Sequence, residues 1–167
     1  MDHYNRLKDR VAIVTGGGRG IGRSVAFAYA REGARVALAA RSGEEIQKGK
    51  AEIEALGCQA LSIQADVSNE GDVERMVQEV LSRWGRVDIL FNAAGLRAVY
   101  PSQDLTLEHW QQVVDANLTG SFLCSKAVFP VMIRSVPLVA GCRVAIRLSH
   151  SGPANNSPQR HEEFEGH

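Results

Sequence analysis

Short apolar runs and longer amphipathic segments alternate along the first 130 positions of the chain. The apolar runs lie at residues 10–15, 35–40, 60–65 and 87–91. Runs of this length and character are typical of parallel strands that are covered on both faces. The segments between them predict amphipathic helices, because their apolar residues return every three or four positions.

Helices are expected over residues 20–32, 44–56 and 73–84, each followed by a glycine that can end it, and from about residue 108 past residue 129. The third of these helices has the most regular apolar period. The side chains predicted to face the core are Ile21, Val25, Ala28 and Tyr29 in the first helix, Ile46, Ile53 and Leu56 in the second, Val73, Met76, Val77, Val80, Leu81 and Trp84 in the third, and Trp110, Val113, Val114, Leu118 and Phe122 in the fourth.

Strands that alternate with such helices predict βαβ units with right-handed crossovers. We therefore expect an α/β protein with a doubly wound parallel sheet of the Rossmann type over residues 1–134. Residues 135–167 diverge: residues 143–148 can supply a fifth strand, and residues 149–167 contain no Val, Ile, Leu or Met. We expect this polar tail to be disordered and the sheet to be incomplete at its C-terminal end, which would leave an edge for homo-oligomer formation.

Charge and cysteine content narrow the class of protein. Nineteen basic residues balance nineteen acidic ones, so the chain has no electrostatic footprint for nucleic acid or an anionic membrane. The polar first ten residues show no secretory signal, and the apolar runs are too short to span a bilayer. Three widely spaced cysteines without a C-x-x-C motif indicate neither a disulfide framework nor a metal site. These features favour a cytoplasmic protein without metal, nucleic-acid or membrane partners.

The candidate chemistry begins between the first strand and the first helix, in the segment from Thr15 to Gly22. Gly16, Gly20 and Gly22 have the spacing G-x-x-x-G-x-G, with Ile21 between the last two. Glycine permits a tight turn and lets backbone N–H groups approach a pyrophosphate, which the positive end of the following helix also favours. The flanking strand and helix favour dinucleotide binding over a glycine-rich turn that has no ligand.

Two arginines indicate which dinucleotide is bound. A fold that selects NAD(H) places an acidic residue at the end of its second strand. Here Ala40 is followed by Arg41, and Arg19 lies inside the glycine loop. Either arginine alone is more often a solvated surface charge, but the two together suit a 2′-phosphate. The expected cofactor is NADP(H), with NAD(H) as the less favoured one.

Four motifs in this order make the chain resemble the classical short-chain dehydrogenase/reductase family over about residues 7–134. They are the glycine loop, Asp66-Val67 after the third strand, the segment from Asn92 to Gly95 after the fourth, and Asn117-Leu-Thr-Gly120 in the last helix. All of these segments except the last follow the carboxyl ends of strands, where open α/β sheets bind ligands.

The resemblance assigns roles to these residues. It implies that Asp66 hydrogen-bonds the adenine amino group, with the backbone of Val67 beside it. The turn from Asn92 to Gly95, in which Ala93 replaces the family's second asparagine, would line the cofactor ribose. Asn117 would hold a water of the proton relay, the alternative being an asparagine that only bends the helix.

The resemblance ends before the family's catalytic residues, which are a tyrosine, a lysine four residues later and a serine after the fifth strand. The chain has three tyrosines. Tyr4 and Lys8 have the right spacing but precede the first strand, Tyr29 belongs to the inward side of the first helix, and Tyr100 is followed by Asp104. A serine in the polar tail, Ser149 or Ser151, could imitate the catalytic serine but is more readily explained as solvated.

Two functions remain open. The resemblance implies an oxidoreductase that exchanges a hydride between NADP(H) and a small carbonyl or alcohol substrate, in the reductive direction. The alternative is a catalytically inactive, truncated nucleotide-binding module without the Tyr–Lys pair. A premature stop, an alternative exon or a frame shift after residue 134 would each produce such a chain, and a poorly folding fragment is a third reading. The segments that would shape a substrate pocket are not recognisable, so no particular substrate is predicted.

Overall fold

Four parallel strands form a sheet within residues 5–135, the part of the chain that this computed structural model describes. β1 lies inside the sheet, where Val14 pairs with Leu38 of β2 and with Phe91 of β4. The strands are β1 (Val11–Thr15), β2 (Arg35–Ala40), β3 (Ala60–Gln64) and β4 (Ile89–Asn92), in the order β3-β2-β1-β4. All four predicted strands are confirmed, although β4 starts two residues later than expected.

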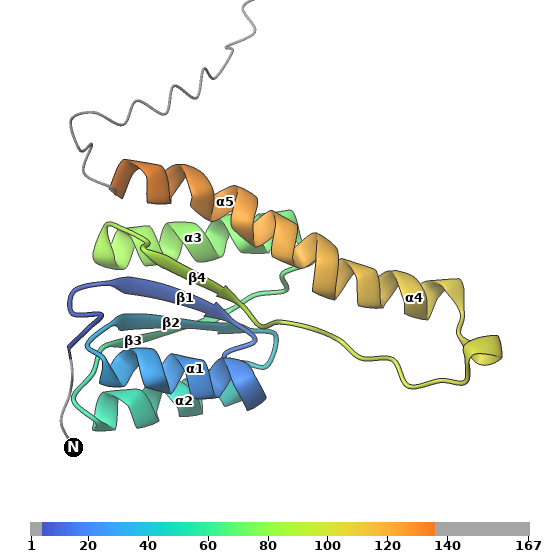
Figure 1. Cartoon of the computed structure of the whole chain (residues 1–167), viewed down its shortest axis with the longest axis horizontal. Helices are drawn as coiled ribbons and strands as arrows, with labels where there is room; N and C mark the ends of the chain where they lie inside the picture. Colours follow the sequence, from blue (N-terminus) through green and yellow to red (C-terminus); the bar gives the residue numbers. More distant parts are fainter. Residues whose placement is uncertain (1–4, 136–167) are drawn as a thin grey trace, which may run out of the picture. The chain divides into compact units, whose positions relative to one another are not determined.

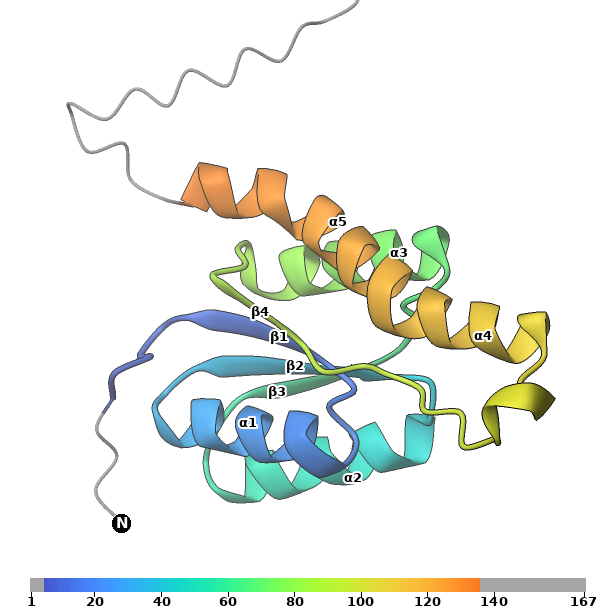
Figure 2. The same cartoon turned by 45° about the vertical axis from the view of Figure 1, so that its right-hand side comes forward.

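Helices cover both faces of this sheet (Figure 1). α1 and α2 lie on one face and α3 and α5 on the other, and the turned view shows the same layers (Figure 2). The helices of these layers are α1 (Gly20–Arg31), α2 (Gly43–Ala55), α3 (Glu70–Trp84) and α5 (Gly120–Ser135). The described residues therefore have the predicted doubly wound α/β fold of the Rossmann type. The predicted strand at residues 143–148, the polar tail and the divergent segment that contains them lie outside the described residues.

α1 packs against the sheet through small residues and not through the stripe that the sequence predicted. Gly22, Ala26 and Ala30 are buried, whereas Ile21 is 75% exposed. Ala28 is also exposed, and only Val25 and Tyr29 of the predicted set are half-buried. The buried stripe is shifted by one position because α1 approaches the glycine loop so closely that the contact leaves no room for a larger side chain.

α2 and α3 follow their apolar patterns more closely. Ile46 and Ile53 of α2 are buried as predicted, but Leu56 is exposed because it follows the last residue of the helix. In α3 the predicted residues from Val73 to Val80 form the buried face, and Gly85 ends the helix with a φ of +74°. The sequence period therefore identified the buried face best where the helix lies over the sheet along its length.

The predicted long helix is a continuous helical stretch that consists of α4 (Leu107–Val114), the π-helical segment η2 (Asp115–Thr119) and α5. Its predicted inward stripe is wrong at Trp110, Leu118 and Phe122, which are 55%, 69% and 62% exposed, whereas Val113 and Val114 are half-buried. The buried residues of the stretch are Gly120, Cys124 and Val128. α4 extends past the ends of the strands (Figure 1), and the wider π turn changes the angular spacing of the side chains. A stripe drawn at the ordinary helical period therefore does not follow the buried side.

The same stretch has a further property that the short apolar runs did not indicate. By length and composition, Leu107–Arg134 is apolar enough to cross a membrane. Cys124 and Val128 are nevertheless buried in the apolar cluster that also contains Met76 and Val80 of α3. This packing is what the fold requires of a helix that covers the sheet.

Candidate functional site

A cleft of about 840 Å³ lies at the carboxyl ends of the strands. Its walls come from the loop after β1, the ends of β2 and β3, and the loop after β4. β2 and β4 lie on opposite sides of β1, so the cleft opens where an α/β sheet binds ligands. The residues predicted to bind the cofactor all line it except Asn92: Gly16, Arg19, Gly20, Ile21, Gly22, Arg41, Asp66, Val67, Ala93 and Gly95.

Glycines allow the loop after β1 to meet its neighbours closely. Gly16 has a φ of +64°, and a Cβ added there would lie 2.6 Å from the carbonyl oxygen of Ala93. A Cβ added to Gly22 would overlap the carbonyl oxygen of Gly16. Gly20 has a φ of +56°, but a Cβ there would meet no atom of the chain within 4 Å. Packing therefore requires glycine at positions 16 and 22, whereas the backbone conformation favours glycine at position 20.

The N-terminus of α1 reaches the cleft without a side-chain cap. Its N-cap residue, Arg19, makes no capping hydrogen bond, and its first turn has no acidic residue. In α3, by contrast, Asn69 Oδ1 accepts a hydrogen bond from the backbone N–H of Asp72 at 3.0 Å. Within the described residues, the first N–H groups of α1 therefore lack the capping oxygen that would compete with a bound anion.

Two guanidinium groups add positive charge to the same cleft. Arg19 is the N-cap of α1, and Arg41 is the first residue after β2. Both are exposed, and within residues 5–135 neither forms an ion pair. Together with the uncapped helix, they make this part of the cleft attractive to a phosphate.

Asp66 is held in a fixed orientation at the end of β3. Its Oδ1 accepts hydrogen bonds from the backbone N–H of Ser68 at 3.0 Å and from Ser68 Oγ at 2.7 Å. Its own backbone N–H donates to Asp72 Oδ2 at 2.9 Å. That bond and a side-chain hydrogen bond from Arg75 hold the pKa of Asp72 below its usual range. Within the described residues Asp66 Oδ2 has no hydrogen-bond partner, so it can accept one from a ligand.

Asn92 and Asn117 lie beside the cleft and connect its walls to the long helix. Asn92 Nδ2 donates to Ser125 Oγ at 3.4 Å, which ties the end of β4 to α5. Asn117, in η2, donates from Nδ2 to the carbonyl oxygens of Leu96 and Val113, each at 2.8 Å. Asn117 therefore fixes the loop after β4, and its role in a proton relay stays a prediction.

Sequence reasoning assigned no role to four polar or charged residues of this region. Thr15 is 1% exposed and accepts hydrogen bonds through its hydroxyl from the loop after β4. Ser42, Glu45 and Arg97 line the cleft itself. A buried threonine at the end of an apolar strand was a usable signal. The sequence contains no comparable signal for Glu45 or Arg97, because only the tertiary structure brings these residues to the cleft.

Neither tyrosine in the described part of the chain lines the cleft. The Tyr29 ring stands edge-on to Phe91, with centroids 6.4 Å apart. The Tyr100 ring, in the loop after β4, stacks on the His109 ring of α4, with centroids 4.6 Å apart. Both rings are thus used in packing, and Tyr4 lies outside the described residues.

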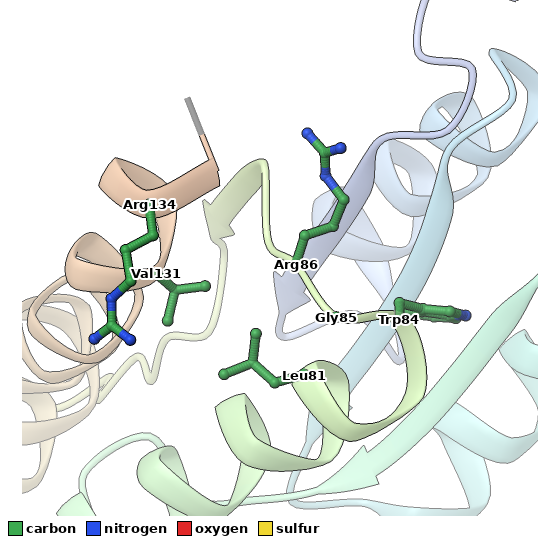
Figure 3. Close-up of a pocket in the computed structure, with 6 residues that line it drawn as sticks. All are labelled: Leu81, Trp84, Gly85, Arg86, Val131 and Arg134. Carbon is green, nitrogen blue, oxygen red and sulfur yellow. The ribbon is translucent and has the colours of Figure 1, made fainter. Parts of the chain in front are cut away.

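A smaller cavity of about 390 Å³ lies beside the connection between α3 and β4 (Figure 3). Leu81 of α3 and Val131 of α5 line it from two helices, and Arg86 and Arg134 also line it. It contains none of the predicted site residues. Within residues 5–135 there is also no group of three His, Cys, Asp or Glu side chains that could hold a metal.

Comparison with known proteins agrees with this geometry. The sequence model of a family described as short chain dehydrogenase matches residues 10–138. A 3-oxoacyl-[acyl-carrier-protein] reductase of Synechocystis sp. (strain ATCC 27184 / PCC 6803 / Kazusa) is 38% identical over 154 residues, which cover 90% of this chain and 62% of the relative. A crystal structure from Sinorhizobium meliloti 1021, described as a short-chain alcohol dehydrogenase, superposes on this chain with a TM-score of 0.74 at 37% identity. The superposed part covers 78% of this chain and 52% of the Sinorhizobium chain. The chain therefore spans less than two thirds of the length of either protein.

Proposed function

The chain belongs to the short-chain dehydrogenase family, and we propose that its cleft binds NADP(H) as the cofactor-binding part of a carbonyl/alcohol oxidoreductase. The family uses nicotinamide dinucleotides. The observation that carries the NADP(H) assignment is the pair Arg19 and Arg41, which both line the cleft and form no ion pairs within residues 5–135. Guanidinium groups bind a phosphate dianion well, and no carboxylate occupies the usual acidic position at the end of β2.

The cleft has the features that a dinucleotide needs. The uncapped N-terminus of α1 offers backbone N–H groups to the pyrophosphate, and Gly16 and Gly20 leave that approach open. Asp66 Oδ2 is oriented to accept a hydrogen bond from the adenine amino group, next to Val67. On the other side, Ala93 and Gly95 provide the surface for the nicotinamide ribose.

When bound, the cofactor exchanges a hydride at C4 of its nicotinamide ring with a carbonyl or carbinol carbon. This chain contributes the binding and the orientation of the cofactor. Asn117 fixes the loop after β4 through Leu96, and in the proposed enzyme it also orients a water that passes a proton. The name of the Synechocystis relative describes a reductase of 3-oxoacyl groups on acyl carrier protein. For this chain we propose the broader class of a small carbonyl substrate, reduced by NADPH.

A second candidate function is NADP(H) binding without turnover by the 167 residues alone. It is favoured by the positions of Tyr29 and Tyr100, since neither lines the cleft and the described lining residues include no tyrosine or lysine that could protonate a developing alkoxide. Such a group contributes about 10²–10⁴-fold to rate. Stereospecific hydride transfer from labelled NADPH by the purified chain, abolished in Asn117→Ala, would identify the active enzyme. Cofactor binding with no transfer would identify the second candidate.

Calorimetric titration with NADPH and NADH tests the cofactor assignment. Wild-type chain should bind NADPH about tenfold or more tightly than NADH, and Arg41→Ala should remove most of that preference, because a charge-assisted hydrogen bond is worth about 1.5–3 kcal/mol. Arg83→Ala, an exposed arginine in the last turn of α3, is the matched control and should leave both affinities unchanged. Equal affinities for the two cofactors, or a preference that Arg41→Ala does not alter, would contradict the proposal.

A further inference from the structure

Glu45 brings a carboxylate to the cleft that Arg19 and Arg41 also line. It lies in the first turn of α2, is half-buried, and rests against the backbone of Gly18. A Cβ added to Gly18 would lie 2.8 Å from Glu45 Cβ and 2.9 Å from Glu45 Oε2. The missing side chain of Gly18 therefore gives Glu45 its place over the glycine loop, at the phosphate-binding side of the cleft.

The Glu45 carboxylate has no ion-pair partner within residues 5–135. It pairs neither with the two arginines nor with any other cation there. An acidic residue in the first turn also stabilises a helix through its macrodipole, and Glu44 is in the same turn. Helix stabilisation alone explains the charge of both residues, but it does not explain why only Glu45 lines the cleft.

We propose that Glu45 is a specificity-determining residue that limits the preference for NADP(H). Its carboxylate repels the 2′-phosphate of NADP(H) and accepts a hydrogen bond from the 2′-hydroxyl of NAD(H). In folds that select NAD(H), an acid at the end of the second strand makes that hydrogen bond. Here Arg41 takes the strand-end position, and the acid comes from α2, one helical turn later. The inference rests on the proposed binding of a nicotinamide dinucleotide in this cleft.

The test compares the dissociation constants of NADPH and NADH for wild type, Glu45→Gln and Glu44→Gln. Both variants keep the side-chain size and remove one negative charge from the first turn of α2, so they lose the same helix stabilisation. Glu45→Gln should tighten NADPH binding by about threefold to tenfold while leaving NADH binding unchanged or weaker. Glu44→Gln should keep the wild-type ratio. The effect of Glu45→Gln should also shrink as salt is added.

The possible results separate the role of Glu45 from the proposed function of the cleft. Normal binding of both cofactors with an unchanged ratio in Glu45→Gln would overturn the role of Glu45 and leave the proposed function intact. An equal loss of affinity for NADPH and NADH would show that Glu45 only supports the loop at Gly18, and would also overturn its role in specificity. Failure of wild type to bind either cofactor would contradict the proposed function itself, and this inference with it.

Discussion

The side-chain hydroxyl of Thr15 accepts a hydrogen bond from the backbone N–H of Ala93 at 3.1 Å. The same oxygen accepts the N–H of Ala94 at 3.2 Å. These bonds join the end of β1 to the loop after β4, two motif segments that are 78 residues apart in the sequence. One buried hydroxyl thus sets the distance between the glycine loop and the opposite wall of the cleft.

Replacing this hydroxyl should destabilise the fold and loosen the cleft. Thr15→Val keeps the β-branched shape but leaves two backbone N–H groups without their acceptor, which should lower the free energy of unfolding by about 1–3 kcal/mol. Thr15→Ser keeps the hydroxyl and is the matched control, expected to lose less. Urea denaturation measures both variants. Equal stability of Thr15→Val and wild type would mean that the two N–H groups find other partners.

Gly22→Ala tests the contact between α1 and the glycine loop. An alanine at an ordinary helical position is more favourable than glycine by about 1 kcal/mol. Here its Cβ would overlap the carbonyl oxygen of Gly16, so we expect a net loss of about 1–3 kcal/mol and weaker cofactor binding. Gly43→Ala in α2 is the control, because its Cβ would come no closer than 3.4 Å to another residue. A stabilised Gly22→Ala variant would contradict the packing described.

Cys124 should react slowly in the native protein. It is fully buried, and burial raises the pKa of its thiol to about 11 because the thiolate loses its hydration. At pH 8 only about 0.1% would be thiolate, so alkylation should be roughly 100-fold slower than in urea-unfolded chain. Mass spectrometry of the peptide that contains Cys124, after timed iodoacetamide treatment, measures the rate. Equal rates in native and unfolded chain would show that α5 does not pack as described.

The exposed apolar side of α5 should promote self-association. Phe122 and Phe129 are both largely exposed, and in the described residues β4 pairs only with β1. Sedimentation equilibrium should show a concentration-dependent mass that Phe122→Gln with Phe129→Gln reduces. Val99→Gln is the control, because Val99 is an apolar residue in the loop after β4 that is even more exposed, at 72%. A wild-type monomer at all concentrations would refute the expectation.

The sequence predicted the parts of this molecule that depend on local pattern. The strands, the start of α1 at Gly20 and the buried face of α3 follow directly from apolar period and glycine position. The positions of Arg19 and Arg41 were also predictable, since both are fixed by the first two strand–helix connections.

Features that depend on tertiary contact were not predictable. The stripe of α1 moved from Ile21 to Gly22 because the helix packs on a backbone carbonyl rather than on side chains. The buried side of the long helix moved to Cys124 because η2 has a different period and α4 extends past the sheet. Glu45 reaches the cleft only because Gly18, from another connection, lies beneath it.

Hydrogen–deuterium exchange of the chain with and without saturating NADPH tests the central claim most directly. Binding in the cleft should slow exchange in peptides that cover residues 16–22, 41–45, 65–67 and 92–95, because these segments form its walls. Peptides around the smaller cavity, at Leu81–Arg86, should be unchanged. If exchange slows only there, or nowhere, the cleft at the carboxyl ends of the strands does not bind the cofactor and the proposed function is wrong.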